Sequence, residues 1–247
     1  MRWGRLSAEN YRGVTLPRSL GLLLALGAVA GTAVAAWAVD ARAWVLLSAC
    51  LLVTAAGLID DVVPVGPRGL RNHLLALASG HMTTGILKVV VIVGAAIVAV
   101  AQVRPPAAWE AVSAVATLAG AANVWNGLDV RPGRALKAYL PCALPFVLVG
   151  EPATAPALLG VFGAAILALP LDLREVAMLG DGGANLLGFA VGLGLVLVLP
   201  GWAVPVAAVV AVALNVVADT VGFSRVIDAT PPLRWIDHLG RARASER

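Results

Sequence analysis

The chain has 247 residues, of which 60% are hydrophobic and only 13% are charged, and its mean hydropathy is +0.90. A soluble domain carries roughly a quarter charged residues, so this composition excludes an ordinary soluble globular protein and predicts a membrane protein. Cys50 and Cys142 both fall inside apolar runs. We therefore expect two buried free thiols rather than a disulfide framework.

Eight apolar stretches are long enough to cross a bilayer, since a span needs about 20 residues and tolerates roughly 17–25. They cover residues 20–39, 43–59, 85–103, 107–126, 134–150, 154–171, 184–199 and 202–222. The pattern predicts an all-α bundle of about eight transmembrane helices, with residues 1–247 forming one integral membrane domain. Leucines among polar residues in the segment 70–78 predict a short helix that lies along the inner membrane surface.

The distribution of charge predicts the orientation of the bundle. All basic residues except Arg42 and Arg104 fall on the side that holds the N-terminus. The positive-inside rule places that side in the cytoplasm, and an even number of spans returns the C-terminus to it. The opposite interface receives the tryptophans of an aromatic belt, namely Trp37, Trp44, Trp109 and Trp202. We expect a multi-pass plasma-membrane protein with both termini cytoplasmic.

Acidic residues gather at three corners on the predicted cytoplasmic side, where acids at a membrane edge are costly and usually functional. The first corner is Asp60-Asp61, which closes the second span. The second is the segment 123–134, and the third is Gly180-Asp181-Gly182-Gly183 at the start of the seventh span. The three corners are far apart along the chain but fall on one side of the predicted bundle.

Two of these corners suit phosphate chemistry that is assisted by a cation. The adjacent carboxylates of Asp60 and Asp61 repel each other, which predicts a cation or a shared proton near them. Asp181 precedes two glycines where a helix begins, so free amides and the helix dipole favour a phosphate there. The Asp181 carboxylate is suited to hold Mg²⁺ against that phosphate.

The second corner presents a polar face followed by a basic one. Asn123, Asn126 and Asp129 recur at helical spacing, which places them near one face of a helix end. Arg134 and Lys137 repeat the spacing on the next helix and form a cationic face for phosphate. Two other interpretations stay open: the basic side chains, with Lys88, act as snorkelling anchors, and Asn123 packs helices together. No histidine pair has zinc-ligand spacing.

The ordered motifs resemble the polyprenyl-phosphate N-acetylhexosamine-1-phosphate transferase superfamily, which includes phospho-N-acetylmuramoyl-pentapeptide transferase. Asp60-Asp61 matches its first aspartate pair, and Asn123-x-x-Asn126-x-x-Asp129 matches the start of its Asn-x-x-Asn-x-x-Asp-Gly motif. Gly180-Asp181-Gly182-Gly183, followed by Gly188, is similar to its Gly-Asp-x-Gly motif. The segment 83–88, which ends in Lys88, also fits the family pattern.

The resemblance implies a reaction that depends on Mg²⁺, or on Mn²⁺ in its place. A sugar-1-phosphate, of N-acetylhexosamine type, passes from a UDP-sugar to a polyprenyl phosphate at the cytoplasmic face, and UMP is released. Asp181 would then be the metal ligand and a catalytic residue, with Asp60 and Asp61 acting on the lipid phosphate. The implied substrate-binding residues are Asn123, Asn126, Asp129, Lys88, Arg134, Lys137 and His238, the last from the remnant of a histidine-rich loop.

The implied partners are therefore the polyprenyl phosphate lipid, the nucleotide sugar and the membrane, with a homodimer as a candidate assembly and no nucleic acid. Val130 and Pro132 replace a glycine and an aspartate of the family motif. This departure keeps an alternative open, a degenerate member that binds the lipid carrier or acts as a scaffold in envelope assembly. A transporter is disfavoured because the acids lie at one face rather than at the midplane.

Overall fold

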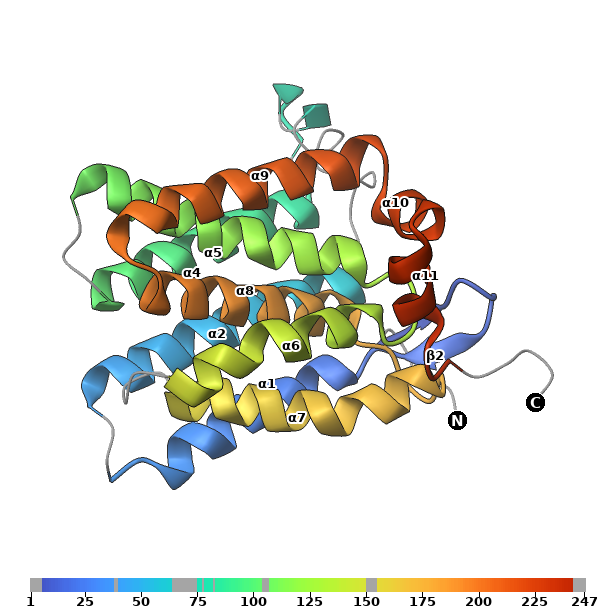
Figure 1. Cartoon of the computed structure of the whole chain (residues 1–247), viewed down its shortest axis with the longest axis horizontal. Helices are drawn as coiled ribbons and strands as arrows, with labels where there is room; N and C mark the ends of the chain where they lie inside the picture. The colour runs from blue at the N-terminus through green and yellow to red at the C-terminus, as the bar shows by residue number, and fades with distance from the viewer. Residues whose placement is uncertain are drawn as a thin grey trace.

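The computed structural model describes residues 6–37, 40–63, 75–76, 78–81, 83–103, 107–149 and 155–241. Long apolar helices lie side by side along the longest axis of the molecule, and a small hairpin and two short helices cover one end of the bundle (Figure 1). The predicted surface helix at 70–78 falls largely outside the described residues.

The hairpin consists of β1 (Ser7–Glu9) and β2 (Thr15–Pro17), which pair antiparallel with Ser7 opposite Pro17. The long helices are α1 (Leu20–Val34), α2 (Ala41–Val62), α4 (Thr84–Val103), α5 (Ala108–Leu128), α6 (Arg134–Val149), α7 (Ala155–Leu173), α8 (Gly180–Val198) and α9 (Val204–Thr220). A 3₁₀ turn, η2 (Gly201–Ala203), precedes α9, and α10 (Phe223–Ala229) and α11 (Pro231–His238) follow it.

Five helices in the described part of the chain are long and apolar enough to cross a membrane. They are α2, α4, α7, α8 and the continuous helical segment Gly201–Thr220, which consists of η2 and α9. The prediction of an all-α membrane bundle is confirmed in this form. The other three predicted spans fall on α1, which has 15 residues, on α5, and on α6, which has 16 residues and contains Pro141 and Pro145. The total of eight spans stays a prediction.

The helix boundaries place the acidic corners differently from the sequence prediction. α2 continues to Val62 rather than ending at 59, so Asp60 and Asp61 lie in its last turn. α8 begins at Gly180 rather than at 184, so Asp181 lies in its first turn. Both acidic groups are therefore carried by helix ends, which position a side chain more rigidly than a loop would.

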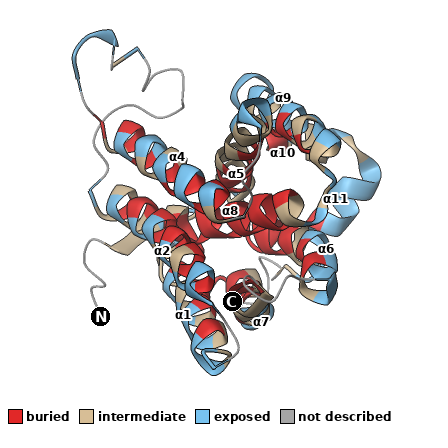
Figure 2. Cartoon of the chain, turned by 90° about the vertical axis from the view of Figure 1, so that its left-hand side faces the viewer, coloured by how far each residue is buried: buried red, intermediate tan, exposed pale blue. Residues whose placement is uncertain are grey.

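The helix α8 lies at the centre of the bundle and is buried along most of its length (Figure 2). It packs against α1, α2, α5 and α6. Glycines on α8 permit this close packing: a Cβ at Gly192 would lie 2.7 Å from Leu118 Cα, and one at Gly188 would overlap the carbonyl oxygen of Ala121. Small residues let membrane helices approach closely enough for their backbones to touch.

The beginning of α8 is also in backbone contact with α1 and α2. A Cβ built at Gly57 of α2 would lie 2.5 Å from the backbone of Asp181, and one at Gly21 of α1 would lie 2.6 Å from the nitrogen of Gly183. Gly180 has a φ of 69°, which favours glycine, and a Cβ there would lie 2.6 Å from Asp61 Oδ2. These glycines therefore bring Asp181 next to the end of α2.

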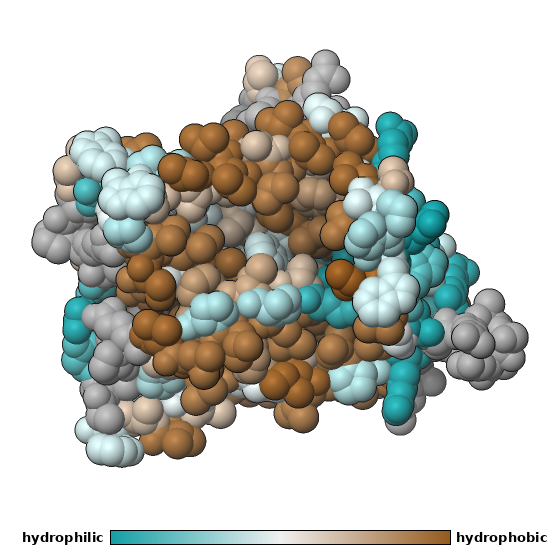
Figure 3. All heavy atoms as spheres, viewed as in Figure 1, coloured by the Kyte–Doolittle hydropathy of each residue, from teal (hydrophilic) through white to brown (hydrophobic). Residues whose placement is uncertain are grey.

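The surface of the bundle matches a membrane environment. Apolar side chains cover the middle of the molecule, and hydrophilic side chains gather at the end that carries α10 and α11 (Figure 3). The four tryptophans predicted as a belt, Trp37, Trp44, Trp109 and Trp202, are exposed and lie near the opposite helix ends. This arrangement supports the assignment of a membrane protein with one polar end.

The expectation for the two cysteines is only half correct. Both are free thiols, and Cys50 is buried as expected, but Cys142 is exposed on the outside of α6. A thiol behaves as a small apolar group, so it sits on a lipid-facing surface without a polar partner. An apolar run therefore does not show which face of a membrane helix points inward.

The contact between Gly57 and the start of α8 predicts that Gly57→Ala lowers the thermal stability of the purified protein, because the added methyl group forces α2 and α8 apart. We expect a loss of about 1–3 kcal/mol, the usual cost of overpacking. Gly94→Ala is the matched control, since a Cβ at Gly94 of α4 meets nothing within 4 Å. Equal unfolding temperatures for the two variants would contradict the close approach.

Candidate functional site

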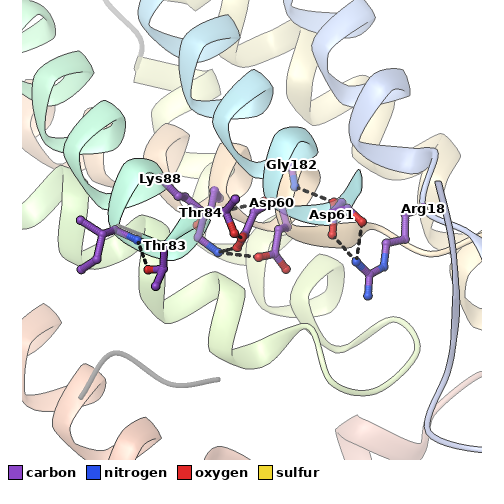
Figure 4. A network of polar contacts seen from close by, with 10 residues as sticks. Arg18, Asp60, Asp61, Thr83, Thr84, Lys88 and Gly182 are labelled. Atoms are coloured by element: carbon purple, nitrogen blue, oxygen red, sulfur yellow. Dashed lines mark hydrogen bonds and ion pairs between the residues drawn. The ribbon is translucent and has the colours of Figure 1, made fainter. Parts of the chain in front are cut away.

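Side chains from α2, α4 and α8 meet around Lys88 at the polar end of the bundle (Figure 4). Lys88 Nζ donates to Asp60 Oδ2 at 2.7 Å and also to Asp181 Oδ2. Thr84 Oγ1 donates to the other carboxylate oxygen of Asp60. Lys88 is therefore a buried counter-ion that two of the predicted catalytic acids share.

The second member of the aspartate pair has a different set of partners. Arg18 Nη1 lies 2.7 Å from Asp61 Oδ1, and the backbone nitrogen of Gly182 donates to Asp61 Oδ2 at 3.3 Å. The Asp61 side chain is only 1% exposed, whereas that of Arg18 is 29% exposed, so this pair is partly buried. The repulsion expected between Asp60 and Asp61 is relieved because Lys88 faces one carboxylate and Arg18 the other (Figure 4).

A cavity of about 320 Å³ opens beside this cluster, and we call it the acidic cavity. Five acids line it, against the two guanidinium groups of Arg18 and Arg131. The acids are Glu9, Asp129, Asp172, Glu175 and Asp181. This excess of negative charge at a membrane edge favours the binding of a cation.

Asp129 differs in its partners from Asp172, Glu175 and Asp181 of the same cavity. Its carboxylate receives no hydrogen bond from the described residues, and it lies just beyond the end of α5. Burial, followed by the negative charges of Asp172, Asp181 and Asp61, raises the pKa of Asp129 well above its usual value. A cation in the acidic cavity would relieve this unfavourable environment.

Three acids of this cavity were missed by the sequence analysis, namely Glu9 of the hairpin and, near the end of α7, Asp172 and Glu175. Asp172 Oδ2 accepts from the backbone nitrogen of Gly133 at 2.7 Å and so holds the turn after Asp129. Glu175 accepts from Asn10 Nδ2 at 2.9 Å and pairs with Arg12 at 3.3 Å. The sequence position of Asp172 and Glu175 could have indicated them, since both follow a predicted apolar span at the same end as the other acidic corners.

The N-terminal hairpin forms one wall of the acidic cavity. The backbone nitrogen of Met178 donates to the carbonyl oxygen of Pro17 at 2.8 Å, which ties β2 to the segment that leads into α8. At the tip, the Arg131 guanidinium lies 4.5 Å from the centre of the Tyr11 ring. The hairpin therefore connects the start of α8 with the turn that follows α5.

The predicted basic face does not reach the acidic cavity. Arg134 binds Asp237 through two nitrogens, Nε at 2.8 Å and Nη2 at 3.0 Å, and also donates to Ser224. Lys137 Nζ donates to the carbonyl oxygens of Ile236, Asp237 and Leu239. Both side chains therefore fasten α10 and α11 to the bundle, and neither is among the residues that line the acidic cavity.

The polar face predicted on α5 is divided between two roles. Asn123 donates to Asn215 Oδ1 of α9, and Asn215 in turn donates to the carbonyl oxygen of Gly120 at 2.9 Å. This is the helix-packing role left open for Asn123. Asn126 is half-buried and, like Asn123, is not among the residues that line the acidic cavity, so only Asp129 of the three reaches it.

Comparison with known proteins assigns no family to the chain. No family model matches it, and no curated protein sequence matches it.

The buried pair of Arg134 and Asp237 generates a prediction about stability. Burial alone would raise the pKa of Asp237. The hydrogen bonds and charge of Arg134, together with the charge of Arg241, instead hold this pKa below its usual value. The stabilisation from this pair is therefore fully present at pH values above the ordinary carboxylate pKa of about 3.9. It is lost as the pH falls through the lower pKa that Asp237 has in the folded protein.

We expect Asp237→Asn to lower the free energy of unfolding by about 3–5 kcal/mol, because it leaves a buried guanidinium without a counter-charge. Thermal unfolding at several pH values should show a constant deficit from neutral to mildly acidic pH. Asp228→Asn, at an exposed position of the neighbouring α10, is the control. A deficit that vanished at neutral pH would contradict the role of the charge pair.

Proposed function

We propose that this protein is a Mg²⁺-dependent phosphoglycosyltransferase that moves a sugar-1-phosphate from a UDP-sugar to a polyprenyl phosphate and releases UMP. The observation that carries the proposal is the meeting of Asp60 and Asp181 on Lys88, at helix ends that adjoin the acidic cavity. The proposal includes eight spans, both termini in the cytoplasm and a site at the cytoplasmic face of the plasma membrane.

The residues of the acidic cavity suit a divalent cation. Mg²⁺ takes oxygen ligands and is usually held by one or two carboxylates together with the phosphates of a substrate. Asp181 lines the cavity and its side chain is one third exposed, and Asp129 lies in the same cavity without a hydrogen-bond partner among the described residues. Asp181 and Asp129 would hold the ion, which would supply neutralisation of the phosphate charge.

The place of the site in the bundle suits two substrates from different phases. The polar cluster lies at the end of an apolar bundle, so an isoprenoid chain in the bilayer can bring its phosphate to the same level as a cytosolic nucleotide. In this proposal Asp60 and Asp61 act on that phosphate from the end of α2, where Lys88 and Arg18 fix their orientations. Neither aspartate is among the residues that line the acidic cavity.

The reaction exchanges one phosphoanhydride for another. An oxygen of the acceptor phosphate bonds to the β-phosphorus of the UDP-sugar, the bond from that phosphorus to the bridging oxygen breaks, and UMP leaves with that oxygen. No redox change occurs, so catalysis requires mainly positioning and charge neutralisation. The fixed carboxylates and the shared lysine provide the positioning.

The proposal predicts that the purified protein releases UMP when it receives Mg²⁺, undecaprenyl phosphate and the correct member of a panel of UDP-sugars. Asp181→Asn should reduce UMP release to background, because it removes the carboxylate that holds the metal. Asp219→Asn, at an exposed position of α9, is the matched control and should retain activity. Binding of the lipid without UMP release from any sugar would favour a scaffold instead.

Lys88 provides a second test that does not depend on turnover. Lys88→Gln removes the shared counter-ion, so Asp60 and Asp181 repel each other and the unfolding temperature should fall. Mg²⁺ should then raise the unfolding temperature of the variant more than that of the wild type, because it replaces the lost positive charge. An equal response of the two proteins to Mg²⁺ would place the metal away from this cluster.

A further inference from the structure

A second cavity, of about 660 Å³, lies beside the acidic one and has the opposite charge. Tyr11 and Arg131 line both cavities. The residues that line the second one are Tyr11, Arg12, Arg131, Asp228, Arg234, His238 and Arg241, and we call it the basic cavity. Four guanidinium groups thus line this cavity with a single carboxylate, whereas carboxylates outnumber guanidinium groups in the acidic cavity.

Two of these arginines have no acidic partner among the described residues. Arg234 makes no side-chain hydrogen bond or ion pair there, and the guanidinium of Arg131 contacts only the ring of Tyr11. Arginine presents several donors in a planar fork that matches two oxygens of a phosphate. Both side chains therefore keep hydrogen-bond donors available to a ligand in the basic cavity.

The edge of the basic cavity is held in place before any ligand arrives. Arg241 donates to the carbonyl oxygen of Pro132 at 3.1 Å and also binds Asp237. Asp237 is in turn fixed by Arg134, and Lys137 binds the carbonyl oxygens at the end of α11. A preordered wall lowers the entropy cost of binding.

We infer that the basic cavity is a binding site for the phosphate groups of an organic phosphate. Its volume lies within the range of small-molecule sites, and the Tyr11 ring offers an aromatic surface beside the arginines. Forked arginine contacts are the usual means of binding phosphate, and the excess positive charge favours an anion over a neutral ligand. This inference does not depend on the proposed transferase activity.

A phosphate in this cavity can come from a soluble nucleotide or from a lipid headgroup, and one experiment separates the two. The wild-type protein is placed in nanodiscs of phosphatidylcholine with EDTA, and the binding of uridine diphosphate is measured by calorimetry. Arg234→Gln and Arg131→Gln should each weaken binding by about tenfold, the loss expected for one charge-assisted contact. Arg225→Gln, at an exposed position of α10 outside the cavity, should leave it unchanged.

The same titration in nanodiscs of phosphatidylglycerol identifies the source. Weaker binding of uridine diphosphate there, with the effect reduced in Arg234→Gln, would assign the cavity to a lipid phosphate. Binding that is independent of the lipid would assign it to a soluble diphosphate. The absence of binding in both lipids, or an equal loss in Arg225→Gln and Arg234→Gln, would overturn the inference. EDTA is present throughout, so this result is distinct from failure of the metal-dependent reaction.

Discussion

The candidate site depends on the close approach of the start of α8 to α1 and α2. Lipid tails are as apolar as leucine, so membrane helices associate through close packing rather than through the hydrophobic effect. Gly21, Gly57 and Gly183 permit this packing because a side chain at any of them would overlap backbone atoms of a neighbouring helix. The contact brings the Gly182 amide to Asp61 and the Asp181 carboxylate to Lys88. The same packing that stabilises the bundle therefore assembles its polar cluster.

Charge is distributed unevenly over the polar end that this packing creates. Asp60, Asp61 and Asp237 each have a cationic partner, so burying these acids at the membrane edge is compensated within the protein. In the two cavities this compensation is partial, since Arg12 pairs with Glu175 and Arg241 with Asp237, whereas Asp129, Arg131 and Arg234 have no ion-pair partner among the described residues. An excess of like charge in a concave site favours a ligand of opposite charge. The structure therefore separates charges that serve stability from charges that are available to ligands.

Hydropathy predicted the helices well because a bilayer core requires every backbone polar group to be bonded within its own segment, which leaves few alternatives to a helix. It also located Asp60, Asp61 and Asp181, since an acid that closes an apolar run stands out in the sequence. The pairing of distant side chains was not predictable in this way. Arg134 and Asp237 are separated by 103 positions, and no spacing rule relates them. Asp172 and Cys142 illustrate a second limit, because a uniformly apolar helix does not reveal which of its faces is buried.

The turn after α5 links the two cavities and relates their charges to one class of ligand. Asp129 lines the acidic cavity, Arg131 lines both, and Asp172 holds this turn through the amide of Gly133. A diphosphate that carries a divalent cation needs carboxylates for the metal and arginines for its remaining phosphate oxygens. A protein that only recognised an isoprenoid chain would need neither group at this position. In the proposed function, the two adjacent cavities would hold the metal and the phosphate oxygens of one ligand, which is the arrangement that a metal-dependent phosphate transfer requires.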